Sequence, residues 1–202
     1  MRARWPWLGL VLCLAFSGPV SGTPHTIFVH VSSPSLPWSS SAVESKLMRQ
    51  LTRNTNGRVV TASALSVSGP KMPADLYSLD SLTQWGLAVG GTYLVVVDVN
   101  NERLQTAKSF HLPLVFHKYQ ATGVIEGELR LIDLPKGKLV LAEPVRIEQK
   151  GPRTFQATMD DDINDPDLHL TAPEKLKFFD RLEEQLAVHV TERVKQTIRL
   201  RR

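Results

Sequence analysis

Trp85–Ile147 read WGLAVGGTYLVVVDVNNERLQTAKSFHLPLVFHKYQATGVIEGELRLIDLPKGKLVLAEPVRI, and this stretch decides the fold. It contains the end of a predicted helix, then the strongly apolar run Tyr93–Val99, and then segments in which apolar and polar residues alternate. A run that is apolar on both faces is typical of a strand buried on both sides, whereas strict alternation is typical of antiparallel strands with one face in water. We therefore expect a buried central strand followed by an antiparallel meander.

Before Tyr93, segments typical of strands and of helices alternate. Thr26–Val31 and Arg58–Ala62 are short runs rich in β-branched residues, which favour strands. A helix is expected from Ser40 or Ser41, both good N-caps, to about Arg53, and a second helix from about Ser78 to Val89. Strand, helix, strand, helix and strand in this order predict parallel pairing through right-handed crossovers.

After Asn100-Asn101 the pattern changes to that of antiparallel strands. Ala107–Lys118 is interrupted by Pro113, which predicts an edge strand or a bulged strand. Val124–Leu134 alternates regularly and, after a tight turn, the apolar positions return as far as Ile147, which predicts a hairpin with one face in water. That wet face is expected to carry Glu126, Glu128 and Arg130.

The C-terminal part is predicted to form a long helix that lies across the sheet. Gln149–Pro173 is polar and acidic, and we expect it to lie outside the sheet. The helix is expected from Glu174 to about Arg199, with Thr171 as its cap. Its apolar stripe consists of Leu176, Phe179, Leu182, Leu186, Val190, Val194 and Ile198. The predicted fold class is mixed α/β: β-α-β-α-β, then an antiparallel meander, in one mixed sheet with helices packed on it.

Residues 1–22 predict a cleaved secretory signal peptide. Arg2 and Arg4 form a positive region, Leu8–Phe16 is a short apolar run, and Val20-Ser21-Gly22 places small residues at the cleavage position. The alternative is an uncleaved membrane anchor, but the apolar run is much shorter than the roughly 20 residues that span a bilayer. Cys13 lies within the apolar run, after a leucine where a bacterial lipobox has a small residue, so we predict no lipobox.

Composition narrows the class of protein further. The chain has 202 residues, 42% of them hydrophobic and 22% charged, which suits a single domain with one core, and we expect that domain to span residues 23–202. Without the leader the balance falls to 22 basic and 20 acidic residues, which argues against nucleic-acid binding. The only cysteine leaves with the leader, which excludes disulfides and thiol chemistry. The mature protein is predicted to be periplasmic or secreted, without a transmembrane segment.

Met159–His169 (MDDDINDPDLH) is the strongest local signal for a binding site. Oxygen ligands at alternating positions suit calcium, but an EF-hand would have glycine at Asp165 and glutamate at Thr171. The main alternative is a solvated loop that leads into the long helix, and a further one is a set of catalytic carboxylates. Calorimetric titration with calcium separates a metal site from a loop. The candidate metal ligands are Asp160, Asp162, Asn164, Asp165 and Asp167.

Other candidate sites have weaker sequence support. His111 and His117 would face the same side of a regular strand, but a zinc site needs further ligands that the sequence does not indicate. Trp38 lies in the Pro/Ser-rich stretch Ser32–Ser41, predicted to be a surface loop, and is a candidate partner-binding residue. The chain contains no nucleophile elbow, no phosphate-binding loop and no H-E-x-x-H pattern, so we predict no catalytic residue.

Two short motifs, taken with the order of elements, carry a resemblance. They are the strand entry Gly91-Thr92-Tyr93-Leu94-Val95-Val96 and the hairpin Gly127-Glu128-Leu129-Arg130-Leu131-Ile132-Asp133 with Lys136-Gly137-Lys138. Over about residues 26–199 the chain resembles bacterial envelope domains: the TolB amino-terminal domain, the curli-secretion lipoprotein and the penicillin-binding-protein activator lipoprotein. Gly91-Thr92 replaces the Gly-Ala-Asp usual in that group. The resemblance implies an exported mixed α/β domain that binds another envelope protein, and it implies no catalytic residues.

Three hypotheses of function follow from the sequence. The first is an exported, soluble, non-enzymatic binding or assembly module of the bacterial cell envelope that contacts another envelope protein. The second is a metal-binding protein or metal-assisted enzyme that uses the acidic stretch Asp160–His169. The third is a structural subunit that associates with itself through a sheet edge near Ala107–Lys118.

Overall fold

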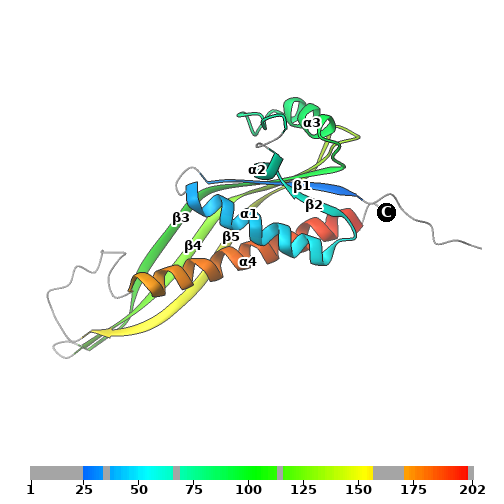
Figure 1. Cartoon of the computed structure of the whole chain (residues 1–202). Helices are drawn as coiled ribbons and strands as arrows, with labels where there is room; N and C mark the ends of the chain where they lie inside the picture. The colour runs from blue at the N-terminus through cyan, green and yellow to red at the C-terminus, as the bar shows by residue number, and fades with distance from the viewer. Residues whose placement is uncertain (1–24, 34–36, 66–68, 113–115, 157–170, 200–202) are drawn as a thin grey trace, which may run out of the picture.

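A five-stranded mixed sheet forms the centre of the molecule (Figure 1). The computed structural model describes residues 25–33, 37–65, 69–112, 116–156 and 171–199. The strand order is β2-β1-β3-β4-β5, with β1 parallel to both β2 and β3, and β3, β4 and β5 antiparallel to one another. The strands are β1 (Thr26–Ser32), β2 (Arg58–Thr61), β3 (Tyr93–Leu112), β4 (Phe116–Asp133) and β5 (Lys138–Gln156). The predicted mixed α/β class is thus confirmed.

Helices cover both faces of the sheet, but to different extents. On one face lie α1 (Pro37–Asn54) and the long C-terminal helix α4 (Ala172–Arg199), which runs along the strands (Figure 1). On the other face α2 (Ala62–Leu65) and α3 (Leu79–Ala88) cover only one end of the sheet (Figure 1). Over the rest of its length this second face carries no helix from the described part of the chain.

Two hydrophobic clusters explain why Tyr93–Val99 is apolar at every position but Asp98. Tyr93, Val95 and Val97 belong to the larger cluster under α1 and α4, whereas Leu94 and Val96 belong to the smaller cluster under α3. The larger cluster includes Val43, Leu47 and Leu51 of α1 and Phe178, Leu182, Leu186, Val190, Val194 and Ile198 of α4. The smaller cluster includes Phe28, Leu82, Trp85, Ile132 and Leu134.

The antiparallel strands are much longer than the sequence suggested. β3 continues through Asn100-Asn101, where the sequence pattern changes, with a bulge at which Val99 pairs with Gly127 and Asn101 with Glu126. Ala107–Lys118 is not one strand but the end of β3 and the start of β4, with Pro113 outside the described residues. The first residues of Gln149–Pro173 also lie in the sheet, since β5 continues to Gln156. A bulge shifts the alternation of side chains, which hides a long strand from periodicity analysis.

Gly127 permits the bulge in β3. A Cβ atom at this position would collide with the carbonyl oxygen of Asp98 in the neighbouring strand. We expect Gly127→Ala to lower the free energy of unfolding by about 1–3 kcal/mol, because backbone rather than a flexible side chain would have to move. Urea unfolding measures this loss. Gly137→Asn is the control, because its left-handed φ of 57° suits Asn and no collision awaits its Cβ; an equal loss there would contradict the account.

The predicted cap Thr171 is confirmed, whereas the predicted caps of α1, Ser40 or Ser41, are wrong. Ser78 caps α3, and the Thr171 backbone N–H and hydroxyl each donate to Glu174 at 2.8 Å, which lowers the pKa of Glu174. α1 begins at Pro37 rather than at Ser40 or Ser41, so Trp38 lies in its first turn and not in a loop. Proline suits the first turn of a helix because its missing N–H has no partner there.

The apolar stripe of α4 is confirmed except at its beginning. Leu176 is 63% exposed, and Phe178 rather than Phe179 is fully packed against the sheet. The helix thus meets the sheet one position earlier than the regular spacing from Leu182 indicated. Trp85 is buried as predicted, and its indole N–H donates to the carbonyl oxygen of Pro70 at 2.9 Å.

Candidate binding surface on the sheet extension

β3, β4 and β5 project beyond the strands that flank them. β1 ends at Ser32, opposite Asp98, and β3 then continues to Leu112. We call residues 101–112, 116–126 and 146–156 the sheet extension (Figure 1). No strand in the described part of the chain pairs with β3 on the β1 side of this extension. Its backbone therefore forms an edge there.

The edges of the sheet differ in character. β2 is only four residues long. β5 contains Pro144 and Pro152, together with bulges opposite Leu131/Ile132 and Gln120/Thr122. Proline, bulges and shortness are the features by which proteins prevent an edge from pairing with another chain. Residues 101–108 of β3 (NERLQTAK) have neither proline nor glycine and stay in continuous register with β4 between two bulges. We call them the β3 edge.

α4 supports one face of the sheet extension. A Cβ atom at Gly123 of β4 would collide with Leu182 and with Phe178, so the glycine allows the helix to lie directly on the strand. A Cβ atom at Gly151 of β5 would likewise come close to the ring of Phe178. Because Phe178 and Leu182 of α4 are both buried, the extension rests on a packed helix rather than projecting alone.

The opposite face of the extension carries a network of charged side chains. Glu126 on β4 accepts from Asn101 at 3.0 Å and pairs with Arg103 of β3 at 3.5 Å and with Arg146 of β5 at 2.5 Å. Arg146 also reaches Glu148 at 3.5 Å. The two arginines are 40% and 56% exposed, so these pairs contribute little to stability. The prediction that this face lies in water is confirmed here. The network also places charged side chains beside the β3 edge.

Arg130 departs from that prediction, because it is only 5% exposed. The ring of Tyr77 covers its guanidinium at 4.2 Å, and the Tyr77 hydroxyl donates to Asp98 at 2.8 Å. That hydrogen bond raises the pKa of Tyr77. The segment before α3 thus shields the sheet at the point where the charged network of the extension begins.

A buried glutamate closes the edge of β1. β2 pairs with β1 only as far as Val29, and the backbone N–H of Val31 then donates to Glu44 Oε1 at 3.2 Å. Glu44 also accepts from the Ser63 hydroxyl and is 3% exposed. Sequence periodicity missed this residue, because a glutamate on an amphipathic helix is usually solvated. The β1 edge is thus satisfied by a side chain.

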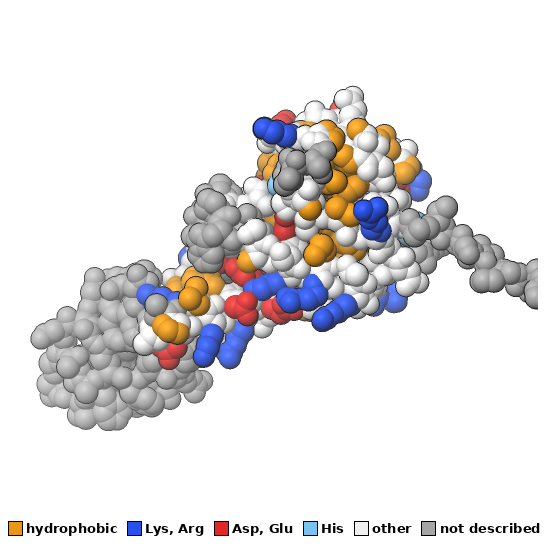
Figure 2. Space-filling model, viewed as in Figure 1, with side chains coloured by type: hydrophobic (Ala, Val, Ile, Leu, Met, Phe, Trp, Pro, Cys, Tyr) orange, Lys and Arg blue, Asp and Glu red, His pale blue; other side chains and the backbone are white. Residues whose placement is uncertain are grey.

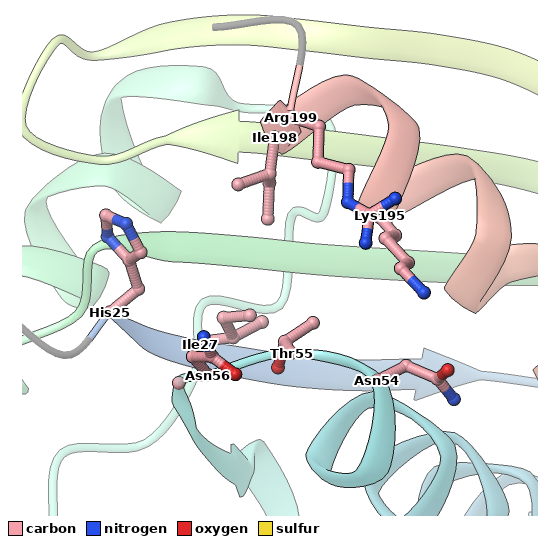
Figure 3. A pocket seen from close by; sticks show the side chains of 9 residues that line it. His25, Ile27, Asn54, Thr55, Asn56, Lys195, Ile198 and Arg199 are labelled. Atoms are coloured by element: carbon pink, nitrogen blue, oxygen red, sulfur yellow. The ribbon is translucent and has the colours of Figure 1, made fainter. Parts of the chain in front are cut away.

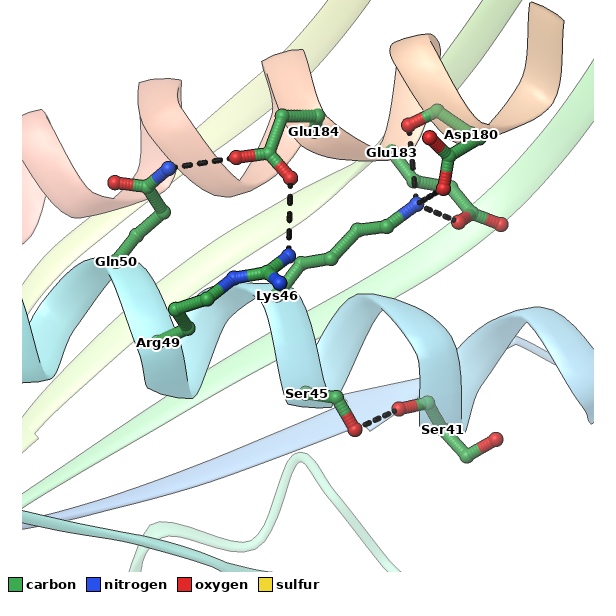
Figure 4. Close-up of polar contacts among 8 residues, drawn as sticks. All are labelled: Ser41, Ser45, Lys46, Arg49, Gln50, Asp180, Glu183 and Glu184. Atoms are coloured by element: carbon green, nitrogen blue, oxygen red, sulfur yellow. Dashed lines mark hydrogen bonds and ion pairs between the residues drawn. The ribbon is translucent and has the colours of Figure 1, made fainter. Parts of the chain in front are cut away.

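An ion-pair network joins the two helices on the other face (Figure 4). Lys46 Nζ of α1 lies 2.5 Å from Glu183 and 2.7 Å from Asp180 of α4. Beside them, Gln50 donates to Glu184 at 2.6 Å. Burial lowers the pKa of Lys46, but the hydrogen bonds to Asp180 and Glu183 outweigh it, so the pKa is raised. In the space-filling view, cationic and acidic side chains are mixed over α1 and α4 (Figure 2).

Arg193 ties α4 to the outermost strand through Glu143, with Nε 2.6 Å from one carboxylate oxygen and Nη2 2.5 Å from the other. These hydrogen bonds lower the pKa of Glu143 from its ordinary 4.5, against the smaller effect of burial. The pair therefore stabilises the fold at neutral pH, and this stability is lost as the pH falls below 4.5 and through the folded-state pKa.

We expect Glu143→Gln to lower stability at pH 7 by at most about 1 kcal/mol, since the pair is partly exposed. Thermal unfolding at a series of pH values measures the difference between variant and wild type. The difference should shrink in acid, where the wild-type carboxyl is protonated and no longer pairs with Arg193. A difference that stays constant into strong acid would contradict the assigned role.

The predicted site residues lie partly outside the described part of the chain. Asp160, Asp162, Asn164, Asp165 and Asp167 fall in residues 157–170, so the calcium site stays a prediction. The side chain of Trp38 is likewise not described. His111 and His117 are not on one strand but are paired across β3 and β4.

The described residues contain no group of three His, Cys, Asp or Glu side chains that could hold a metal ion. None of the described helices is long and apolar enough to cross a membrane.

No protein-family model matches the sequence, and no curated protein matches it either. The fold is similar to solved structures that include bacterial lipoproteins. Hypothetical protein CT253 from Chlamydia trachomatis is 11% identical, with a TM-score of 0.49 over 87% of this chain and 98% of that one. Lipoprotein GNA1162 from Neisseria meningitidis is 13% identical (TM-score 0.43; 81% and 99%). The PelC dodecamer from Paraburkholderia phytofirmans is 12% identical (TM-score 0.42; 83% and 86%). At such identities the likeness concerns the fold alone.

Proposed function

We propose that the protein is an exported, non-enzymatic binding or assembly module of the bacterial cell envelope that contacts another envelope protein through the β3 edge. The observation that carries the proposal is the contrast among the edges of the sheet. β2 is short, β5 is interrupted by prolines and bulges, and β1 is closed by Glu44. The β3 edge, residues 101–108, lacks these protections.

The mode of binding would be strand addition. An extended segment of the partner hydrogen-bonds to the N–H and C=O groups of residues 103–108 that point away from β4, and these main-chain bonds supply affinity. Specificity comes from side chains beside the edge, and Arg103 and Glu126 offer both charges on the open face. The two bulges that bound residues 101–108 limit the register in which a partner strand can align.

The leader-like residues 1–22 support the cellular part of the proposal. A cleaved signal peptide would deliver residues 23–202 as a single domain to the periplasm or the exterior. The resemblance to the TolB amino-terminal domain, the curli-secretion lipoprotein and the penicillin-binding-protein activator belongs to the same proposal, because it implies an envelope partner.

Site-specific photo-crosslinking in exporting cells tests the proposal. A photoreactive residue is placed at Arg103 on β3 or, as a matched control, at Arg146 on β5. Both arginines pair with Glu126 on the same face of the sheet, but they flank different edges. We expect a crosslinked product from position 103 and none from position 146. A product from position 146 alone, or equal products from both, would contradict the proposal.

Proline substitution shows whether the product depends on backbone pairing. Successive N–H groups of a strand point to opposite sides, so proline at Glu102, Arg103 and Leu104 removes donors alternately from the β4 ladder and from the free edge. We expect the variants that keep wild-type unfolding midpoints to lose the crosslink. A product of twice the chain mass would identify a second copy of the chain and favour the self-associating subunit.

A further inference from the structure

A cavity lies at the end of the molecule opposite to the sheet extension. It has a volume of about 130 Å³ and is formed by three segments: the start of β1, the connection from α1 to β2, and the last turns of α4 (Figure 3). Lys195 and Arg199 reach over it from α4, and His25 lies at its other side (Figure 3). The remaining lining residues are Ile27, Asn54, Thr55, Asn56, Gly57 and Ile198.

The lining is cationic and, among the described residues, contains no carboxylate. Within the described part of the chain, neither Lys195 nor Arg199 has an ion-pair or hydrogen-bond partner, whereas Lys46, Arg146 and Arg193 all have carboxylate partners. The two cations are four positions apart on one helix, so they are neighbours and repel each other. Such a pair is stabilised when an anion lies between the two charges.

The carbonyl groups at the nearby end of α1 do not take the place of an anion between Lys195 and Arg199. Cations near the end of a helix gain from its negative carbonyl end, which would explain one lysine or arginine there. However, the amide of Asn54 donates to the Gln50 carbonyl at 2.8 Å, and the N–H and hydroxyl of Thr55 both donate to the Leu51 carbonyl at 2.8 Å. The carbonyls of Gln50 and Leu51 are thus satisfied by residues of the cavity itself.

We infer that this cavity binds a small oxyanion of the phosphate class, with Lys195 and Arg199 as its charged ligands and the Asn56 side chain as a neutral one. The volume corresponds to about four water molecules, which suits a single tetrahedral anion. Such an anion is either free phosphate or the headgroup of an anionic phospholipid. The site lies far from the β3 edge and is independent of partner binding there.

Titration of the folded domain with inorganic phosphate, followed by NMR of the backbone amides, tests the site. We expect saturable shifts at Asn56 and Gly57, and at least a tenfold loss of affinity in the Lys195→Gln/Arg199→Gln double variant. Arg181→Gln is the matched control, because it removes an exposed arginine from the same helix outside this cavity. Phosphate, but not an equal ionic strength of chloride, should also raise the wild-type unfolding midpoint, a measurement that needs no variant.

Sedimentation with vesicles separates the two sources of phosphate. Binding to phosphatidylglycerol vesicles but not to phosphatidylcholine vesicles, lost in the double variant and competed by inorganic phosphate, would identify a lipid headgroup. Saturable phosphate binding without vesicle binding would identify a free anion. The inference is overturned if neither ligand binds, or if Arg181→Gln weakens binding as much as the double variant does, since the attraction would then be unspecific.

Discussion

Lys46→Met should lower the free energy of unfolding by about 3–5 kcal/mol, because it leaves a buried carboxylate without its cation. Glu183 is 3% exposed, and its carboxylate lies 2.5 Å from Lys46 Nζ. Asp180 is 72% exposed, so it can be solvated when the lysine is absent, and the loss comes mainly from Glu183. Urea unfolding at neutral pH measures the effect.

The double variant Lys46→Met/Glu183→Leu is the control for this interpretation. Replacing a buried ion pair by apolar side chains of similar volume is often neutral or stabilising, so we expect the double variant to recover most of the lost stability. If it is as unstable as Lys46→Met, the loss comes from packing and not from an unpaired charge. In that case the ion pair is not what joins α1 to α4.

The raised pKa of Lys46 gives the pair a pH dependence of known sign. Its contribution is fully present below the ordinary value of 10.5 and is lost as the pH rises through the higher folded-state pKa. Wild-type protein should therefore lose stability in strong alkali through this group. The Lys46→Met/Glu183→Leu variant should lack that part of the loss.

Leu134→Ala should lower the free energy of unfolding by about 2–5 kcal/mol, the range for a fully buried leucine whose site cannot collapse. Leu134 is 0% exposed, and its side chain fills the space over Gly86 of α3 and over Gly91, where a Cβ atom would collide with it. Neither glycine has a side chain that could fill the cavity. Thermal or urea unfolding measures the loss.

Leu139→Ala is the matched control for Leu134→Ala. Leu139 lies five residues later, near the start of β5, and is 40% exposed, so its truncation should change stability only slightly. Equal losses at the two positions would show that α3 is not anchored by Leu134. The smaller hydrophobic cluster would then have to be held by other contacts.

The parts of the fold predictable from sequence are those where burial sets the pattern. Tyr93–Val97 is buried by helices on both sides, and every position is apolar. The stripe of α4 from Leu182 to Ile198 likewise follows from contact with one continuous core. In both cases a single physical demand, removal of apolar surface from water, acts on each residue at a regular interval.

The sheet extension was not predicted from the sequence because less apolar surface is removed from water there. Among the residues that the structure describes, the first half of α4 covers one of its faces, and bulges in β3 shift the alternation at Asn100 and Ser109. The buried polar residues were missed for a different reason. Glu44 and Lys46 on α1 are charged residues of types that are usually solvated, and their partners come from β1 and α4, which only the tertiary structure brings close.

Hydrogen exchange at the β3 edge tests the central claim most directly. In the free protein, the amides of residues 101–108 should alternate between slow exchange, where they bond to β4, and fast exchange, where they face the open edge. When the partner identified by crosslinking at position 103 is added, the fast amides should become slow. Uniform protection in the free protein, or fast amides that stay fast in the complex, would contradict strand addition at this edge.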